Sequence, residues 1–269
     1  MTFGPIFSFL FGTIIGSFLN VVIFRYNTGH SINGRSGCLS CGQTLSARDL
    51  IPILSWLFLR GRCRKCGSRI SIQYPLVEFF TGLLFVALFW MSSEFIGSPV
   101  AAASYFVWHA IIFATLIIIF VYDLKHKIIP DGLSYFFAGL TLIQALITNP
   151  IYPTHTTISI LNLLSGPILF LPFFALWLIS SGRWIGLGDG KLALGIGWYL
   201  GFISGLSAVV LAFWIGAVFA VIFMLTERLR LGRKNITMKT EIPFAPFLII
   251  GTIIEFFLRI DVIGIGIFF

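Results

Sequence analysis

Charged residues are scarce in this sequence. Of its 269 residues, Lys and Arg account for 18 and Asp and Glu for only 10, so 10% of the chain is charged while 58% is hydrophobic. Soluble domains average about 25% charged and about 45–50% apolar residues. This shortage excludes an ordinary soluble enzyme built on one large core. Together with a mean hydropathy of +0.99, it predicts a polytopic membrane protein.

Two patterns that would indicate other chemistries are also missing. The sequence has no HExxH motif, which a zinc metalloprotease typically carries. It has no basic stretch interleaved with aromatic residues, so the net charge of +8 does not indicate nucleic-acid binding. The basic residues gather instead in the predicted loops, which is typical of the cytoplasmic side of a membrane protein.

The apolar runs predict an all-α polytopic membrane protein with about eight transmembrane helices, most of them near the ~20 residues that a bilayer requires. Every basic cluster then falls on one side of the membrane, and both termini are expected outside. The spans are expected near residues 5–24, 74–91, 101–122, 128–149, 158–180, 191–202, a run ending near 225, and 243–259.

One segment, residues 25–73, differs in character from the rest of the chain. It carries eight basic residues against the single acid Asp49, and it contains all four cysteines, as the pairs Cys38-x2-Cys41 and Cys63-x2-Cys66. Two such pairs about twenty residues apart are typical of a zinc site with four thiolate ligands. Two disulfides are the alternative, and a reducing cytoplasm disfavours them. Four thiolates occupy all four coordination positions of a tetrahedral zinc ion and leave none for water, so this zinc is expected to be structural.

Two aspartates carry the predicted chemistry. Asp189 lies in the glycine-rich turn Gly186-Leu187-Gly188-Asp189, at the mouth of a hydrophobic span, and Asp123 ends another apolar run. An ionisable residue at membrane depth is costly and is therefore a functional candidate that needs a partner. Two carboxylates brought to the same face can share one proton and activate a water molecule. A structural alternative for Asp189 is capping of the helix that follows.

Four other residues could support this pair or serve only the helices. Glu78 follows Pro75 near a helix start, where a negative charge suits the helix dipole, and a role at the membrane face is the other possibility. Asp131 follows Pro130 and suits the free amides of a helix start. Lys191 is expected to open the span after the glycine-rich turn.

The ordered set of motifs resembles the prepilin peptidase family, the type IV leader peptidases, which are grouped with the GxGD aspartic proteases. The resemblance covers nearly the whole chain, and Ala245 is one small departure, because the family often has glycine there. The motifs that carry it are Gly16-Ser17-Phe18-Leu19-Asn20, the two cysteine pairs, Asp49-Leu50-Ile51-Pro52, Tyr74-Pro75-Leu76-Val77-Glu78, Asp123 with Ile129-Pro130-Asp131, Gly186-x-Gly188-Asp189-x-Lys191, and Ile242-Pro243-Phe244-Ala245-Pro246-Phe247.

The resemblance implies an enzyme with two activities. Family members remove the basic leader from type IV prepilin or pseudopilin precursors at the cytoplasmic face of the inner membrane. Many then methylate the new N-terminus with S-adenosylmethionine. Asp123 and Asp189 correspond to the catalytic pair, and the four cysteines to the family's cysteine tetrad. We expect three parts: a first span (1–24), a zinc module associated with methyl transfer (25–73) and a transmembrane peptidase domain (74–269), with lipids and precursor proteins as partners.

Other functions fit the residues less well. An ion-coupled transporter could use Asp123 and Asp189 as a proton relay. It should show inverted repeats and broken helices in both halves, and only one glycine-rich break is present. A membrane-anchored zinc module without chemistry would leave the two membrane-face aspartates unexplained.

Overall fold

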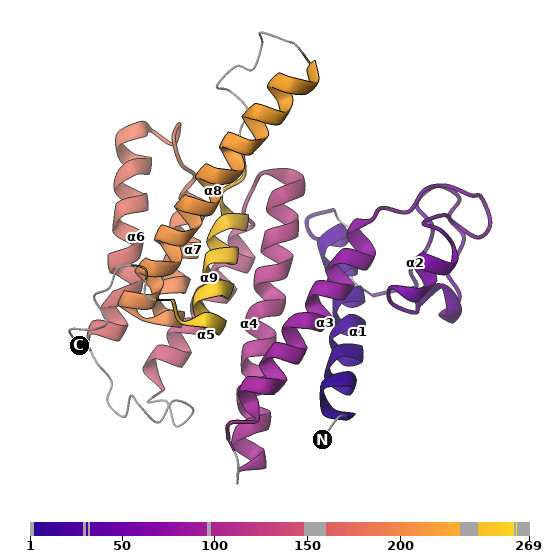
Figure 1. The fold of residues 1–269 in the computed structure, drawn as a ribbon, viewed down its shortest axis with the longest axis horizontal. Coiled ribbons are helices and arrows are strands. Elements are labelled where there is room, and N and C mark those ends of the chain that lie inside the picture. Colours follow the sequence, from indigo (N-terminus) through magenta and orange to yellow (C-terminus); the bar gives the residue numbers. More distant parts are fainter. Residues whose placement is uncertain are drawn as a thin grey trace. The chain divides into compact units, whose positions relative to one another are not determined.

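The computed structural model describes residues 3–28, 31, 33–95, 98–147, 160–231, 242–260 and 262. Within these ranges the chain forms nine α-helices and one 3-10 helix (Figure 1). Extended pairing in the same ranges is limited to two isolated bridges, Gly37 with Thr44 and Arg62 with Arg69. The predicted all-α class is therefore confirmed.

Each of the eight predicted spans corresponds to a helix. Five of these helices are long and apolar enough to cross a membrane: α1 (Phe3–Arg25), α3 (Gln73–Ser92), α4 (Pro99–His126), α6 (Ile160–Ser180) and α8 (Phe202–Leu231). The other three have 14 to 16 residues, fewer than the ~20 that a bilayer needs, and are α5 (Asp131–Leu146), α7 (Leu187–Leu200) and α9 (Ala245–Leu258).

Two boundaries differ from the prediction in a way that affects the candidate site. Helix α7 begins at Leu187, not at Lys191, and α4 continues to His126. Asp123 and Asp189 therefore lie inside helices and not in the loops beside them. The loop at Asn149, the basic cluster Arg233, Lys234 and Lys239, and the C-terminal Phe269 lie outside the described residues.

The chain divides into two compact units, residues 1–118 and 119–269, with the division inside α4. In the first unit α1 packs against α3. A Cβ atom on Gly12 would lie 2.8 Å from the Cα of Gly82, and one on Gly16 would lie 2.7 Å from the Cα of Glu78. These two glycines, spaced as in a GxxxG motif, thus let two backbones approach closely.

In the second unit α7 packs against α5, α6, α8 and α9. Glycines make this possible: a Cβ on Gly195 would meet the Phe137 ring of α5, and one on Gly197 would lie 2.6 Å from the carbonyl oxygen of Ser165 on α6. The Ser165 hydroxyl in turn donates a 2.7 Å hydrogen bond to the Gly197 carbonyl. Helix α7 is short and glycine-rich because its neighbours leave little room, and this packing fixes the position of Asp189.

Candidate active site and metal centre

Asp123 lies in the last turn of α4 and is only 3% exposed. Its carboxylate accepts a hydrogen bond from the backbone N–H of Ala245, the first residue of α9. Pro246 suits the first turn of a helix, because a proline there sacrifices no intrahelical hydrogen bond. One carboxylate oxygen, Oδ2, is buried and has no hydrogen-bond partner in the described structure. The Pro-Phe-Ala-Pro-Phe motif therefore brings a helix N-terminus to Asp123.

Asp189 occupies the third position of α7 and is 7% exposed. Gly186, the N-cap residue, donates its backbone N–H to the Asp189 carboxylate. Asp189 thus satisfies one of the free amides at the helix start, as a residue at this position often does. Its Oδ1 atom, like Oδ2 of Asp123, is buried without a hydrogen-bond partner among the described residues. The alternative that made Asp189 the N-cap is wrong, because Gly186 holds that position and Asp189 lies inside the helix.

The second unit brings these two aspartates together. Asp123 lies close enough to act electrostatically on Asp189. The segment that follows α4 also reaches the start of α7, since a Cβ on Gly188 would lie 2.9 Å from the Cβ of Ile129. Each carboxylate keeps one oxygen unpaired in a buried position, which is costly unless a ligand or water uses it. Two buried carboxylates of this kind are candidates for acid–base chemistry on a shared water.

Lys191 and Asp131 form an ion pair and do not join the aspartate pair in the described structure. The Lys191 ammonium lies 2.7 Å from Asp131 Oδ1 and 4.7 Å from the centre of the Tyr135 ring. Asp131 is the first residue of α5, after the N-cap Pro130. The ion pair therefore ties α5 to α7 two residues beyond Asp189. Sequence reasoning expected Asp131 to serve its own helix and did not identify Lys191 as its partner.

Glu78 belongs to the first unit, so the second unit alone carries the aspartate pair. The expected position in the first helical turn is wrong, because α3 begins at Gln73 and places Glu78 in the second turn. Its Oε2 atom accepts a 2.7 Å hydrogen bond from the backbone N–H of Ile53, in the cysteine-bearing loop. The Ser17 hydroxyl of α1 also hydrogen-bonds to the Glu78 carboxylate. Glu78 thus connects the loop to α1 and α3.

The four cysteines form one cluster. The Sγ atoms of Cys38, Cys41, Cys63 and Cys66 all lie within 4.8 Å of one another. The Sγ atoms of Cys38 and Cys66 are 3.8 Å apart. Four sulfurs at about 2.3 Å from a central zinc ion would be about 3.8 Å from one another. The four thiols therefore lie close enough to bind one metal ion, and their spacing fits it.

The two cysteine pairs are held by matching turns. In the first, the Gly42 N–H donates to the Cys38 carbonyl and the Cys38 N–H to the Gln43 carbonyl, and the second repeats this pattern around Cys63 and Gly67. Gly42 and Gly67 have positive φ angles of +66° and +70°, which glycine adopts at little cost. Each turn points two sulfurs toward one centre, as the sequence predicted.

Hydrogen bonds from Ser68 favour the thiolate form of two of the cysteines, Cys38 and Cys66. The Ser68 hydroxyl lies 3.5 Å from Cys38 Sγ and 3.2 Å from Cys66 Sγ. These contacts lower the pKa of both thiols, that of Cys38 to about 6. Thiolates are the form that binds a metal ion. Ser68 was not among the residues predicted from the sequence.

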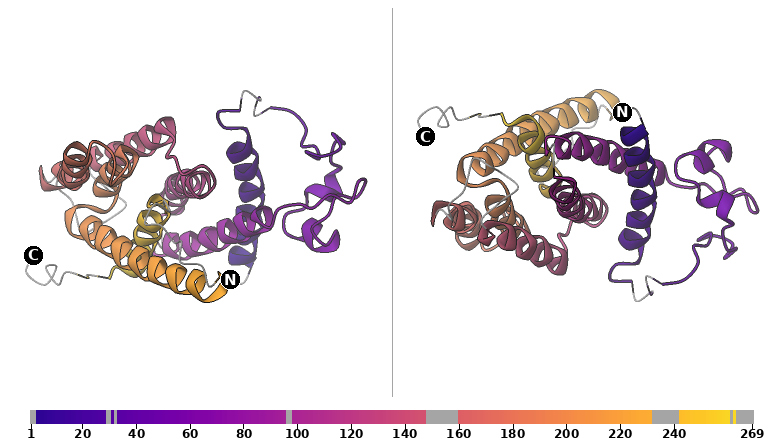
Figure 2. Two further views of the ribbon diagram at one scale, coloured as in Figure 1. Left: turned by 90° about the horizontal axis from the view of Figure 1, so that it is seen from above. Right: turned by 90° about the horizontal axis from the view of Figure 1, so that it is seen from below.

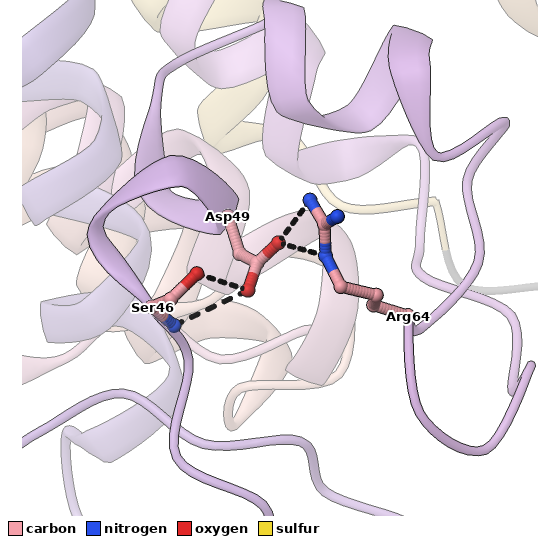
Figure 3. Close-up of polar contacts among 3 residues, drawn as sticks. All are labelled: Ser46, Asp49 and Arg64. Carbon is pink, nitrogen blue, oxygen red and sulfur yellow. Dashed lines mark hydrogen bonds and ion pairs between the residues drawn. The ribbon is translucent and has the colours of Figure 1, made fainter.

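A carboxylate connects the second cysteine turn to Ser46, at the start of the short 3-10 helix Ala47–Leu50 (Figure 3). Asp49 Oδ1 accepts from Arg64 Nε and pairs with an Arg64 terminal nitrogen, each at 2.8 Å, and Arg64 lies inside the second Cys-x2-Cys turn. Oδ2 accepts a 2.6 Å bond from the Ser46 hydroxyl and a 3.2 Å bond from the Ser46 backbone N–H. The Ser46 hydroxyl, followed by Arg64, holds the pKa of Asp49 below its usual range. The Ser-x-x-Asp spacing typical of a capping box was the signal available in the sequence.

Comparison with known proteins gives the family to which the chain is similar. Two family models match: the bacterial peptidase A24 N-terminal domain over residues 10–92, and the type IV leader peptidase family over residues 110–221. An Escherichia coli protein named type 4 prepilin-like proteins leader peptide-processing enzyme is 32% identical, over 95% of this chain and 94% of its own. A Bacillus subtilis protein named prepilin leader peptidase/N-methyltransferase is 33% identical, over 92% of each chain. No solved structure matches.

The fold and the paired carboxylates define a multi-pass membrane protein with a candidate aspartic protease site. The chain belongs to the type IV leader peptidase family, which confirms the resemblance identified from its motifs. Neither the family models nor these relatives support the transporter alternative.

The two glycines of the GxGD turn should differ in importance. A Cβ on Gly188 would lie 2.9 Å from the Ile129 Cβ, too close without a backbone shift, whereas one on Gly186 would meet nothing closer than 3.4 Å, an ordinary contact. We expect Gly188→Ala to lower turnover about tenfold or more, because displacement of a catalytic group by about 1 Å can cost about a hundredfold. Gly186→Ala is the matched control and should retain most activity. Initial rates of precursor cleavage would test this, and equal losses in both variants would contradict it.

The Asp49 cluster should stabilise the metal centre in a pH-dependent way. The pKa of Asp49 is depressed in the folded protein. The stability that its charge gives to the loop is therefore complete above the ordinary aspartate pKa of about 4, and it is lost as the pH falls through the lower pKa of the folded state. We expect Asp49→Asn to speed metal release to a chelator roughly fivefold at neutral pH, since a partly exposed charged hydrogen bond contributes about 1 kcal/mol. The ratio of the metal-release rates of the variant and the parent should approach one at the lowest pH, where Asp49 is protonated.

The matched control for Asp49 is Glu94→Gln, since Glu94 is an exposed acid outside the loop. Its metal-release rate should equal that of the parent. A ratio for Asp49→Asn that does not change with pH would show that the charge of Asp49 is not responsible.

Proposed function

We propose that this protein is a prepilin leader peptidase that uses Asp123 and Asp189 as its catalytic pair. The observation that carries the proposal is the pair itself: two buried carboxylates on different helices, each with one unpaired oxygen, in electrostatic contact. The names of the relatives supply the substrate class, a leader peptide on a prepilin-like protein.

The roles of the two carboxylates follow from their surroundings. Peptide hydrolysis by an aspartyl pair needs one ionised carboxylate to accept a proton from water and one protonated carboxyl to polarise the scissile carbonyl. Two carboxylates in one site can share a single proton, because both cannot easily be charged together. The N-termini of α7 and α9 donate the Gly186 and Ala245 amides and stabilise the one negative charge. The unpaired oxygens Oδ2 of Asp123 and Oδ1 of Asp189 are then the atoms that take part in proton transfer to and from water.

The substrate chemistry suits a site at a helix end. A basic leader can stay in water while the apolar helix that follows it lies among the membrane helices. The junction between the two then comes to the level of Asp123 and Asp189. We place the protein in the bacterial inner membrane, with the pair facing the cytoplasm and both termini outside, because the basic clusters of the sequence then all lie on the cytoplasmic side.

The relatives' names also support a second activity, methylation of the new N-terminus. S-adenosylmethionine is the methyl donor that the family resemblance implies, and we leave its binding residues unassigned. We assign zinc to Cys38, Cys41, Cys63 and Cys66, whose spacing fits a closed tetrahedron. With all four positions taken by sulfur, this zinc would hold the loop together and leave no position for a catalytic water.

Replacing either aspartate should test the peptidase. Asp123→Asn and Asp189→Asn keep the size of the side chain but cannot cycle a proton, so we expect each to lower cleavage by at least about a hundredfold. The double variant should be no worse than either single one if the two act as a unit. Mass spectrometry of a prepilin-type precursor incubated with each purified variant gives the product.

Asp49→Asn is the matched control for these variants, because it makes the same chemical change in the other compact unit. It should cleave at a near-normal rate. Near-normal cleavage by Asp123→Asn or Asp189→Asn, with the variant inserted in the membrane, would rule out the aspartyl mechanism.

Removing the metal ligands should separate the two activities. The loop is too short to fold securely on its own core, so a bound zinc ion would supply much of its folding free energy. We expect a Cys63→Ser, Cys66→Ser variant to lose most methyl transfer while cleavage persists at a reduced rate. Both activities and the zinc content would be measured on one preparation. Full methylation without zinc would contradict the structural role, and equal loss of both activities would mean that the loop also supports the aspartate pair.

A further inference from the structure

Helix α2 (Leu54–Phe58), in the cysteine-bearing loop, exposes one apolar face. Leu54, Leu57 and Phe58 are 50%, 56% and 84% exposed. Their spacing of three and four residues places them on the same side of the helix. Leu50 and Ile51, just before α2, are 43% and 46% exposed. We call these five residues the α2 face. Apolar residues gathered in this way indicate a surface that another apolar phase covers.

The opposite side of α2 is fixed to the loop, which determines the direction of the α2 face. The Trp56 indole N–H donates a 3.2 Å hydrogen bond to the Ile70 carbonyl. The Trp56 ring also packs on Gly61, where a Cβ would lie 2.9 Å from a ring carbon. Trp56 thus faces the loop interior, and the α2 face must point away from the loop.

A buried hydrogen bond sets the level of α2 relative to the membrane. The backbone N–H of Ile53, directly before α2, is held by Glu78 Oε2 at 2.7 Å. Glu78 lies five residues inside α3, which is about 7 Å along the helix axis. The 20 residues of α3 measure about 30 Å, the thickness of the hydrocarbon core, so the whole of α3 is needed to cross it. The start of α2 is therefore level with the outer part of the bilayer and not with the water beyond it.

The backbone at this link is held in an uncommon conformation. Ile53 has a φ angle of +61°, which is rare for a β-branched residue. Such a conformation persists only where the surrounding contacts fix it. The Glu78 carboxylate supplies that contact and is only 6% exposed. The loop lies to one side of the α1–α3 pair in all the views (Figures 1 and 2).

The charges around the α2 face are basic. Arg48, Arg60 and Arg62 are exposed, and none of the three forms an ion pair in the described part of the chain. The one acidic side chain of the loop, Asp49, is already paired with Arg64. An apolar face rimmed by arginines is typical of a segment that lies in the plane of a membrane surface containing anionic lipids.

From these observations we propose that the α2 face is an interfacial anchor, which seats the metal-binding loop in the headgroup and acyl boundary of an anionic bilayer. The leucines and Phe58 enter the acyl boundary, and the three arginines contact phosphate groups. The loop is then held by its two connections to α1 and α3, by the hydrogen bond from Ile53 to Glu78 and by this anchor. The proposal does not depend on the peptidase or methyltransferase activity.

Photo-crosslinking of the full-length protein tests the anchor. Phe58 is replaced by the photoreactive p-benzoylphenylalanine, and the protein is reconstituted in nanodiscs of phosphatidylcholine with phosphatidylglycerol. After irradiation, mass spectrometry identifies what is attached. We expect lipid adducts at position 58. The matched control carries the same group at Ser40, which is exposed in the first cysteine turn, and should give little lipid adduct.

Other occupants of the α2 face would give other products. An adduct to a second copy of this chain, or to an added prepilin-type precursor, in place of lipid would overturn the proposal. So would equal lipid labelling at positions 58 and 40. Monodisperse elution and an unchanged melting temperature would establish that each labelled protein is folded.

A charge variant tests the arginine rim. In Arg48→Gln, Arg60→Gln, Arg62→Gln, lipid labelling at position 58 should fall severalfold, and raised salt should lower labelling of the parent. In discs of phosphatidylcholine alone, parent and variant should label equally. If the parent and the variant gave equal lipid labelling in anionic discs, the assignment of an anionic bilayer as the partner would be contradicted.

Discussion

Two carboxylates, each with an unpaired oxygen, sit in the interior of a membrane protein, and their cost constrains the rest of the second unit. A buried carboxylate is tolerated only where nearby groups offset its charge. Here each aspartate accepts a single backbone hydrogen bond, from Ala245 for Asp123 and from Gly186 for Asp189. Because the remaining oxygens Oδ2 and Oδ1 stay unpaired, the site is held in place by packing more than by polar contacts.

Helix α7 provides that packing. Its residues Leu192, Ala193 and Ile196 are fully buried. Its glycines accept close contact with Ile129, Phe137 and Ser165 from neighbouring segments. The Lys191–Asp131 ion pair adds one polar tie between α5 and α7. A glycine-rich helix surrounded on several sides is an effective way to hold one side chain in a fixed place, since no flexible side chains separate the backbones.

The cysteine-bearing loop is organised on a different principle. It has few buried apolar residues, and its turns are held by backbone hydrogen bonds, positive-φ glycines and the Asp49–Arg64 pair. Metal binding would complete a structure whose sulfurs already lie together. Glu78 then joins this loop to α3 through Ile53. The loop is thus built around polar and metal-binding groups, whereas the helices are built around glycine contacts and apolar packing.

The sequence by itself determined the class of the protein, the positions of its helices and the cysteine cluster, and it predicted the pairing of Asp123 with Asp189. Each of these rests on local composition or spacing: apolar runs of membrane length, Cys-x2-Cys pairs, and a carboxylate at the end of an apolar run. The tertiary structure alone decided that Glu78 binds Ile53, that Lys191 pairs with Asp131, and that Asp49 pairs with Arg64 in the second cysteine turn. It also showed that the Ala245 N–H donates to the Asp123 carboxylate and that α7 starts before Asp189. These contacts join residues far apart in the chain or depend on which backbone amides are free, and neither hydropathy nor residue spacing encodes them.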